Sequence, residues 1–261
     1  MGIIADSRKK EILTLLKEQG EVTVTELAQK FNLSQLTIRR DLDALAESAL
    51  VIRIHGGAKA AFLPGNFLGS MREIDFSNKS ILNITEKQAI GKKAVAFIDD
   101  NATIFMNSGS TTLFFLQALQ DKCVQVATNN AAATDVDYDD AHITLYVLGG
   151  EFRKTSKSFI GSMTEQAIKS IHSNFTILGT NGIDVNKGLT TGIYEECSTN
   201  LAMVEHTLSK VIVLADHTKF GVISNFISIP IDKIDMVITD SQCDPLQIAA
   251  LEEKGIEVVI A

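Results

Sequence analysis

One short stretch of the chain places side chains that can bind bases and phosphates on a single helical face. Residues 34–45 read Ser-Gln-Leu-Thr-Ile-Arg-Arg-Asp-Leu-Asp-Ala-Leu. Ile38, Leu42 and Leu45 recur at the spacing of one helix face, and the stretch opens with serine, a favoured N-cap residue. The opposite face carries Gln35, Thr37, Arg39 and Arg40. Arg and Gln can hydrogen-bond base edges bidentately, and all four can reach phosphate, so this helix is predicted to bind DNA.

The same arginines could instead form the solvated side of an ordinary amphipathic helix. The preceding sequence favours DNA binding, because it predicts two further short helices. Apolar spacing predicts a helix over residues 7–18, and a Thr23-x-x-Glu26 capping box predicts the start of a second. Their inward faces would be Ile12, Leu15, Leu16, Leu27 and Phe31.

After the third helix, Val51–Ala58 is predicted to form a β-strand that ends in a glycine turn, with Val51, Arg53 and His55 on one face. Such a strand would be the wing of a winged helix-turn-helix over residues 1–60. This segment holds nine Lys/Arg against eight Asp/Glu, a net charge of +1, which leaves −9 for the remainder of a chain whose total is −8. The basic groups suit a duplex-binding surface. The predicted DNA-binding residues are Ser34, Gln35, Thr37, Arg39, Arg40, Arg53, His55 and Lys59.

A second stretch has the composition of an anion site. Asn107-Ser-Gly-Ser-Thr-Thr112 follows the apolar run Ala102–Met106 and precedes a helical segment near residues 111–120. Glycine allows a tight turn, hydroxyls supply donors, and a helix start offers free N–H groups and a positive dipole end. Any one such turn could equally be a plain strand–helix connection with a Ser/Thr cap.

Three more strands are predicted to end in polar or glycine-rich turns, at Gly149-Gly150, at residues 179–184 and at residues 215–221. The predicted strands are Ala102–Met106, Val124–Thr128, Ile143–Leu148, Phe175–Leu178, Val211–Leu214, Met236–Thr239 and Glu257–Ile260. They alternate with helical segments near residues 85–98, 111–120, 130–136, 164–172, 195–208 and 245–254. Apolar strands that alternate with helices predict a mostly parallel, doubly wound α/β domain. Ligands bind beyond the carboxyl ends of such strands, so the four turns should converge.

Length and composition fit this division. The 261 residues are 45% hydrophobic and 21% charged, which suits a winged helix-turn-helix (1–60), a linker (61–84) and a larger α/β effector-binding domain (85–261). The chain holds no apolar run near the ~18 residues of a membrane span and no signal peptide at its start, so a cytoplasmic location is predicted.

Neither a metal nor a cofactor is predicted. Cys123, Cys197 and Cys243 are odd in number and far apart, which favours free thiols in a reducing compartment. The five histidines are scattered without any pairing at metal-ligand spacing.

The N-terminal pattern resembles the DeoR-type bacterial transcription regulators. The resemblance rests on Arg8, Ile12 and Leu16, then Ser34 and Thr37–Leu42, then His55–Ala58. It implies a DNA-binding regulator, and it extends over nearly all of the larger domain, which in this family resembles sugar-phosphate isomerases and typically binds a phosphorylated sugar or related metabolite.

By that resemblance, Ser108–Thr112 would hold phosphate with Lys154 and Lys219 as partners, and other polar residues would contact sugar hydroxyls. The predicted effector-binding residues are Asn107, Ser108, Gly109, Ser110, Thr111, Thr112, Gly149, Gly150, Lys154, Asn181, Gly182, Asp184, Glu195, Asp216 and Lys219.

The chain departs from the family pattern at two positions. Asn107 stands where relatives commonly have Asp, and Asn200 stands where they commonly have Lys. Both changes remove charge from the predicted site. Two amides can hydrogen-bond but cannot move protons, so no catalytic residue is predicted.

Three functions compete at this stage. The leading hypothesis is a repressor of a carbohydrate utilisation operon, a homodimer or homotetramer that binds palindromic operator DNA and is controlled by a phosphorylated carbohydrate. The alternatives are an active sugar-phosphate isomerase-like enzyme or hydrolase with an appended DNA-binding domain, and a DNA-binding scaffold with a vestigial site. Turnover of sugar phosphates would identify the enzyme, and the absence of any stabilising small molecule would favour the scaffold.

Overall fold

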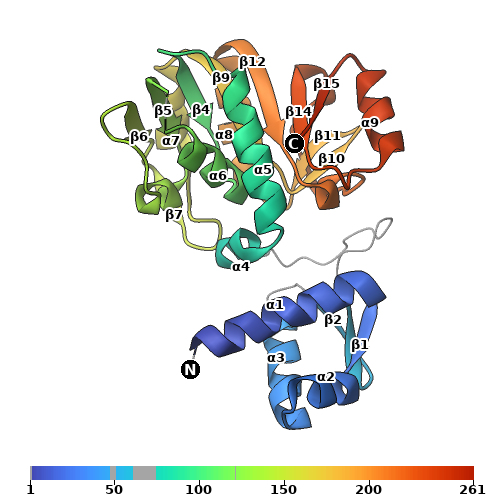
Figure 1. Ribbon diagram of the computed structural model, residues 1–261. Helices are drawn as coiled ribbons and strands as arrows, with labels where there is room; N and C mark the ends of the chain where they lie inside the picture. The colour runs from blue at the N-terminus through green and yellow to red at the C-terminus, as the bar shows by residue number, and fades with distance from the viewer. Residues whose placement is uncertain (1, 48–50, 61–74, 121) are drawn as a thin grey trace. The chain divides into compact units, whose positions relative to one another are not determined.

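The chain divides into two compact units, residues 1–81 and 82–261. The computed structural model describes residues 2–47, 51–60, 75–120 and 122–261 (Figure 1). Residues 61–74 of the predicted linker therefore lie outside the described residues, and a short helix, α4 (Phe76–Ile81), lies in the remainder. The predicted domain limits, 1–60 and 85–261, stay predictions.

The first unit has the helix and strand order of a winged helix-turn-helix. Its elements are α1 (Gly2–Gln19), β1 (Glu21–Thr23), α2 (Val24–Phe31), α3 (Gln35–Glu47), β2 (Val51–Ile54) and β3 (Gly57–Ala60). The predicted start of α2 is confirmed, because the Thr23 hydroxyl accepts the Glu26 N–H at 3.2 Å while the Glu26 carboxylate accepts the Thr23 N–H at 3.0 Å. Ile12, Leu16 and Leu27 are buried as predicted, whereas Leu15 and Phe31 are only half-buried.

The predicted strand that ends in a glycine turn is confirmed as β2, but it is shorter than predicted, and the second strand, β3, was not predicted. The chain reverses at Gly56, whose φ of +81° lies in the left-handed region that favours glycine. Strand β3 then pairs with both β2 and β1, which gives a three-stranded antiparallel sheet. The close approach of β1 requires Gly57, since a Cβ there would lie 2.1 Å from the Val22 carbonyl oxygen. His55 therefore lies in the turn and not on a strand face.

An ion pair ties the first helix of this unit to the third. The Arg8 guanidinium donates to both carboxylate oxygens of Asp41, at 2.6 and 3.1 Å. Asp41 is only 7% exposed although it lies on a polar helix. The pair therefore holds α3 against α1 beside the apolar contacts of Ile38 and Leu42, which are both fully buried.

The second unit is built on seven parallel strands. In chain order they are β4 (Thr103–Met106), β5 (Val124–Thr128), β6 (Ile143–Val147), β9 (Ser173–Gly179), β12 (Thr207–Leu214), β14 (Met236–Thr239) and β15 (Glu257–Ile260). Their order across the sheet is β15-β14-β12-β9-β4-β5-β6, with every neighbouring pair parallel. All seven predicted strands are confirmed.

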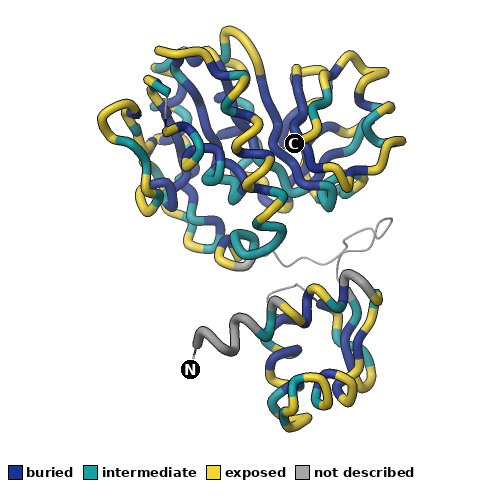
Figure 2. The backbone as a smooth tube through the Cα atoms, viewed as in Figure 1, coloured by how far each residue is buried: buried dark blue, intermediate teal, exposed yellow. Residues whose placement is uncertain are grey.

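Helices cover both faces of this sheet (Figures 1 and 2). On one face, α5 (Ile84–Ala94) and α6 (Ser110–Ala118) pack on Ile104 and Met106 of β4. On the other face, α7 (Ser162–Lys169) and α8 (Tyr194–Glu205) pack on Phe105. Successive residues of one strand thus enter different core layers, which explains why the strands are apolar throughout. The prediction of a doubly wound α/β domain is confirmed.

Several elements of the second unit differ from prediction. The predicted helix near residues 245–254 is present as α9 (Pro245–Glu252). In place of the α-helix predicted near residues 130–136, a 3₁₀ helix forms, η2 (Ala131–Asp135). The helix predicted over residues 85–98 ends early, and the chain continues as a second 3₁₀ helix, η1 (Val95–Phe97). Two antiparallel additions were not expected: a hairpin of β7 (Glu151–Arg153) and β8 (Ser158–Ile160), and a sheet of β10 (Gly182–Asp184), β11 (Gly188–Thr191) and β13 (Phe226–Ile229). Strands of three or four residues are too short for periodicity to reveal.

The sequence Thr85-x-x-Gln88 has the pattern of a capping box, but it does not cap α5. The helix begins at Ile84, one residue before Thr85, so Thr85 lies inside the first turn. The N-cap residue is Asn83 in a left-handed conformation, and its side chain makes no cap hydrogen bond to this helix.

We expect the Arg8–Asp41 pair to stabilise the first unit. Arg8→Ala leaves a nearly buried carboxylate without its partner, so the free energy of opening α3 should fall by about 1.5–3 kcal/mol. Native-state hydrogen exchange of the α3 amides in the full chain measures this. Lys30→Ala is the control, because it removes an exposed pair with Glu11 (3.5 Å) that should contribute no more than about 1 kcal/mol. Equal effects of the two substitutions would contradict the role given to Arg8.

Candidate functional site

The exposed face of α3 presents the side chains that were predicted to bind DNA. Ser34 starts the helix, since its hydroxyl oxygen accepts the Thr37 N–H at 3.2 Å. The inward residues Ile38, Leu42 and Leu45 are at most 3% exposed. Gln35, Arg39 and Arg40 are consequently exposed together, and their donors can reach base edges or phosphates.

The predicted wing residues lie in three different settings. His55 is exposed in the β2–β3 turn, and Lys59 is partly buried on β3 opposite Glu21. Arg53 instead contacts its own unit: its Nε donates to Asp43 of α3 at 2.8 Å, and its Nη1 donates to the Gly57 carbonyl. The guanidinium therefore joins the wing to α3 and offsets a carboxylate on the helix that carries Arg39 and Arg40. Whether these residues contact DNA stays a prediction.

A second candidate site lies at the carboxyl edge of the seven-stranded sheet. Strands β4 and β9 are neighbours, and the strand order reverses between them. From β4 the chain builds the sheet outward through β5 and β6, and from β9 it builds the sheet in the opposite direction. Loops that follow two such strands diverge, and the crevice between them is where ligands of doubly wound proteins bind. The Asn107–Thr112 loop and the loop after Gly179 flank this point.

The side chain of Asn107 bridges the two strands at this point. Its Oδ1 accepts the Gly179 N–H at 2.8 Å, and its Nδ2 donates to the Gly179 carbonyl at 3.0 Å. The residue is 5% exposed. Its amide thus acts like a backbone group and extends the pairing of β4 with β9 beyond the last strand residues.

The start of α6 lies against the same point. Gly109, the N-cap residue, has an ordinary extended conformation with φ −94° and ψ 150°. A Cβ at Gly109 would lie 3.1 Å from the Gly179 Cα and 3.3 Å from the Thr112 side chain. Glycine is needed here for close approach of two backbones and not for a positive φ. The Thr112 hydroxyl donates to the carbonyls of Asn107 and Gly109, so it holds the loop.

The second departure from the family pattern joins this cluster. Asn107 Nδ2 also donates to Asn200 Oδ1 at 3.3 Å, and Asn200 Nδ2 donates to the Ser228 hydroxyl at 2.9 Å. Both amides are buried, with Asn200 8% exposed. The two positions therefore form a neutral hydrogen-bonded chain.

A polar group beyond β9 contains a carboxylate that the sequence reasoning missed. Asn181 Nδ2 donates to the Thr191 hydroxyl at 3.2 Å, and that hydroxyl donates to Glu196 Oε2 at 2.9 Å. Glu195, the residue that was predicted, is exposed instead. The helical direction of α8 decides which of the two adjacent glutamates turns toward Thr191, and no local signal distinguishes them.

Other predicted residues have structural contacts of their own. Asp184 accepts the N–H groups of Asn186 and Lys187 in the β10–β11 turn. A Cβ at Gly150 would lie 2.1 Å from the Thr164 hydroxyl, and one at Gly182 would lie 2.2 Å from the Val222 carbonyl oxygen, so both glycines allow close packing. Gly149 and Lys154 are exposed. Their part in ligand binding stays a prediction.

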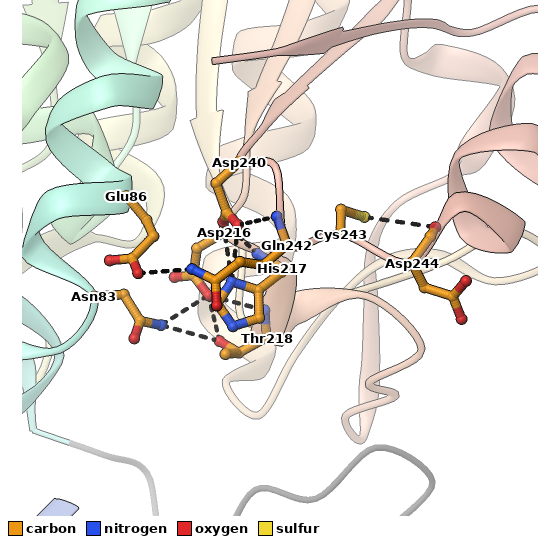
Figure 3. A network of polar contacts seen from close by, with 9 residues as sticks. All are labelled: Asn83, Glu86, Asp216, His217, Thr218, Asp240, Gln242, Cys243 and Asp244. Atoms are coloured by element: carbon orange, nitrogen blue, oxygen red, sulfur yellow. Dashed lines mark hydrogen bonds and ion pairs between the residues drawn. The ribbon is translucent and has the colours of Figure 1, made fainter. Parts of the chain in front are cut away.

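Asp216 is the most deeply buried ionised group at this edge (Figure 3). Burial alone would raise its pKa, but the charge of Lys219, the hydrogen bonds from Thr218 and the charge of Lys87 lower the pKa to about 2. The carboxylate is therefore ionised at neutral pH. Its Oδ1 accepts Asn83 Nδ2 and the Thr218 N–H, both at 3.0 Å.

Lys87 and Asn83 were not predicted, and both come from the start of α5. Lys87 is only 2% exposed, although its position in the sequence suggests a solvated helix face. The nearby His217–Asp240 pair is a further addition. The backbone N–H of His217 donates to Asp240 Oδ2 at 2.8 Å. In the same loop as Asp240, Gln242 Nε2 donates to Glu86 Oε1 of α5 at 3.0 Å (Figure 3).

The described residues form neither a metal site nor a membrane-spanning helix. Among the described parts of the chain, no group of three or more His, Cys, Asp or Glu residues is placed to hold a metal ion. No helix within the same described ranges is long and apolar enough to cross a membrane.

Comparison with known proteins decides the family. Residues 82–241 match the sequence pattern of the family described as the DeoR C terminal sensor domain. Residues 8–61 match that of the DeoR-like helix-turn-helix domain. The chain belongs to the DeoR family of transcriptional regulators. The resemblance of residues 34–45 and the wing to this family is thereby confirmed.

Curated relatives extend over nearly the whole chain. The glycerol-3-phosphate regulon repressor of Escherichia coli strain K12 is 32% identical over 235 residues, which cover 90% of each chain. The lactose phosphotransferase system repressor of Staphylococcus epidermidis is 30% identical over 216 residues, covering 82% of this chain and 83% of that one. The regulator GolR of Listeria innocua is 29% identical and covers 97% of this chain and 98% of that one.

Similarity to solved structures is weaker. Ribose 5-phosphate isomerase A from Neisseria gonorrhoeae is 17% identical and superposes with a TM-score of 0.35. The superposition covers 51% of this chain and 52% of the isomerase. A TM-score of this size supports no inference about activity.

In this DeoR-family protein we expect α3 to be the reading helix. Arg39→Ala and Arg40→Ala should each weaken binding to a selected DNA duplex by about 1–3 kcal/mol if the guanidiniums contact base edges or desolvated phosphates. Fluorescence anisotropy at fixed salt measures the affinity, and circular dichroism checks the fold. The charge-matched control is Lys92→Ala, which removes an exposed cation from α5. Unchanged affinity in both arginine variants would show that this face is only solvated.

Proposed function

We propose that this protein is a transcriptional repressor of a carbohydrate utilisation operon. It binds operator DNA through α3 and the wing, and a phosphorylated sugar or related metabolite at the carboxyl edge of the larger sheet controls that binding. The names of the relatives support this proposal, because two of them are repressors of a lactose phosphotransferase system and of a glycerol-3-phosphate regulon.

The observation that carries the effector proposal is the position of the α6 start at the point where the strand order reverses. Gly109 and Gly179 bring two backbones together there, and the first N–H groups of α6 lie at the same edge. A helix start favours a phosphate through its N–H groups and its positive dipole end. Lys219 and Lys87 add two positive charges near one carboxylate, Asp216, which also favours an anionic ligand.

Binding without turnover fits the two amides at this point better than the isomerase-like alternative. Asn107 is held by both backbone groups of Gly179, and Asn200 is held by Ser228. Neither amide can donate or accept a proton in a reaction at neutral pH. We therefore propose that the site recognises its ligand and does not convert it.

Operator recognition gives a reason to propose a homodimer or homotetramer. Half-sites of palindromic operators reflect a two-fold axis in the protein that binds them. The larger unit is the proposed site of assembly, because it leaves the reading face of α3 available to DNA.

The first test is titration calorimetry of the full chain with a panel of sugar phosphates, glycerol 3-phosphate included, and their unphosphorylated parents. We expect one phosphorylated compound to bind much more tightly than its parent. Its affinity should change by about 1–3 kcal/mol when the operator duplex is present, and operator affinity should change by the same factor, because coupling is reciprocal. Equal effector affinities with and without operator would refute control by that compound, and turnover of it would favour the enzyme.

A second prediction concerns the close approach at Gly109. Gly109→Val should abolish the response to the compound identified above while operator binding is retained, because the new side chain must displace Gly179 or Thr112. Anisotropy titrations with and without that compound measure this response.

Gly192→Val is the matched control for Gly109→Val. A Cβ at Gly192 meets no atom within 4 Å, and the backbone there has no positive φ. This variant should respond normally. A normal response of Gly109→Val would show that the Asn107–Thr112 loop is only a connection and that the ligand binds elsewhere.

A further inference from the structure

Asn83 has two roles at the point where the chain enters the larger unit. It is the second residue of that unit and the N-cap of α5, and its carbonyl accepts the Lys87 N–H at 3.0 Å. Its backbone has φ 51° and ψ 43°, a left-handed conformation that is uncommon outside glycine and that asparagine tolerates. Its conformation therefore sets the direction from which residues 81 and 82 lead into α5.

The side chain of Asn83 does not cap its own helix. Its Nδ2 donates to Asp216 Oδ1 at 3.0 Å and lies 3.5 Å from the Thr218 hydroxyl, both in the segment after β12 (Figure 3). Asp216 in turn is the N-cap of η3 (His217–Lys219). One hydrogen bond thus joins the start of the larger unit to the most buried carboxylate of the proposed effector site.

The two oxygens of this carboxylate are used unequally. Oδ1 accepts from Asn83 and from both the N–H and the hydroxyl of Thr218. Oδ2 is buried and has no hydrogen-bond partner among the described residues. A buried carboxylate oxygen without a donor is costly, so a ligand hydroxyl that donates to Oδ2 gains free energy from this site.

The first turn of α5 makes a second contact with a loop of the larger unit, through Glu86. Glu86 accepts from Gln242 at 3.0 Å, in the loop after β14, and Asp240 of that loop accepts from His217. The first turn of α5 is therefore held to two neighbouring loops. Only the contact through Asn83 involves a carboxylate with an unsatisfied oxygen, as far as the described residues show.

We propose that Asn83 is the positioning residue that transmits occupancy of the Asp216 site to the chain segment leading to the DNA-binding unit. The inference rests on the proposed function and adds its route of regulation. A ligand hydroxyl at Oδ2 draws the carboxylate toward the ligand and lengthens the Asn83 contact at Oδ1. Without that contact, Asn83 loses an interaction that offsets its left-handed conformation, and the start of α5 changes direction. The effect on DNA binding can be no larger than the difference in ligand affinity between the two arrangements.

The test is a double-mutant cycle that needs no effector. Asn83→Gly removes the side-chain contact but keeps the left-handed backbone accessible, and Asp216→Ala removes the carboxylate that accepts from Asn83. The full-length single and double variants are compared by affinity for the selected duplex and by hydrogen exchange of the amides of residues 84–87. We expect each single variant to change duplex affinity by about fivefold or more, the low end of typical coupling, and in the same direction. The double variant should match the single variants, with faster exchange at the start of α5 in all three.

The outcomes separate this inference from its alternatives. Independent effects that multiply in the double variant would overturn it, as would unchanged exchange at residues 84–87 in Asp216→Ala. Asn101→Gly is the control, because Asn101 is also left-handed, with φ 64°, but is exposed in the turn before β4. An equal shift in Asn101→Gly would mean general destabilisation and would refute a specific route.

Two further arrangements keep the result decisive. If Asp216→Ala does not fold, Asp216→Leu replaces it in the cycle, since it also removes the acceptor of the Asn83 hydrogen bond and leaves no cavity. The calorimetric panel tests the proposed function separately. If a sugar phosphate releases the duplex but the effects in the cycle are additive, the proposed function stands and the route through Asn83 is overturned. If no compound binds, control by a sugar phosphate is overturned, and a non-additive cycle still shows that Asn83 and Asp216 are coupled to DNA binding.

Discussion

The larger unit depends on one contact, the pair of hydrogen bonds between the Asn107 amide and the backbone of Gly179. It lies where the strand order reverses, so no strand residue continues the pairing of β4 with β9 at that edge. The amide takes the place of a further backbone pair and brings the start of α6 close to the β9 loop. Because Gly109 and Gly179 have no side chains, the two backbones can meet there. The geometry of the proposed phosphate site is therefore a consequence of how the two halves of the sheet are joined.

The same contact gives a structural role to Asn107, which stands where relatives commonly have an aspartate. An aspartate at position 107 could accept the Gly179 N–H, but it could not donate to the Gly179 carbonyl. An asparagine does both, and Asn200 completes the set with a neutral partner. The most deeply buried charged group at this edge lies farther along the sheet, at Asp216 with Lys87 and Lys219. The proposed site thus has a neutral, buried part at the centre and a charged part tied to the start of the unit.

In the smaller unit, paired charges orient the helix that presents Arg39 and Arg40. Both carboxylates in the middle of α3 are used internally: Asp41 pairs with Arg8 of α1, and Asp43 pairs with Arg53 of β2. These pairs offset two negative charges that would otherwise repel phosphates. They also link the helix to α1 on one side and to the wing on the other, so the apolar core and the ion pairs act on the same element.

The sequence alone determined the features that depend on neighbours along the chain. Helical spacing in residues 34–45, the Thr23–Glu26 capping box and apolar runs such as Val211–Leu214 are local signals, and they predicted both folds and the helix that is proposed to read DNA. Only the tertiary structure decided the features that depend on distant contacts. From the sequence alone, Lys87 would be assigned to a solvated helix face, whereas in the folded protein its charge acts on Asp216. Likewise, Asn83 donates a hydrogen bond to that carboxylate, 133 residues away. Periodicity reports which side of an element faces a core, but it carries no information on which distant side chain lies opposite.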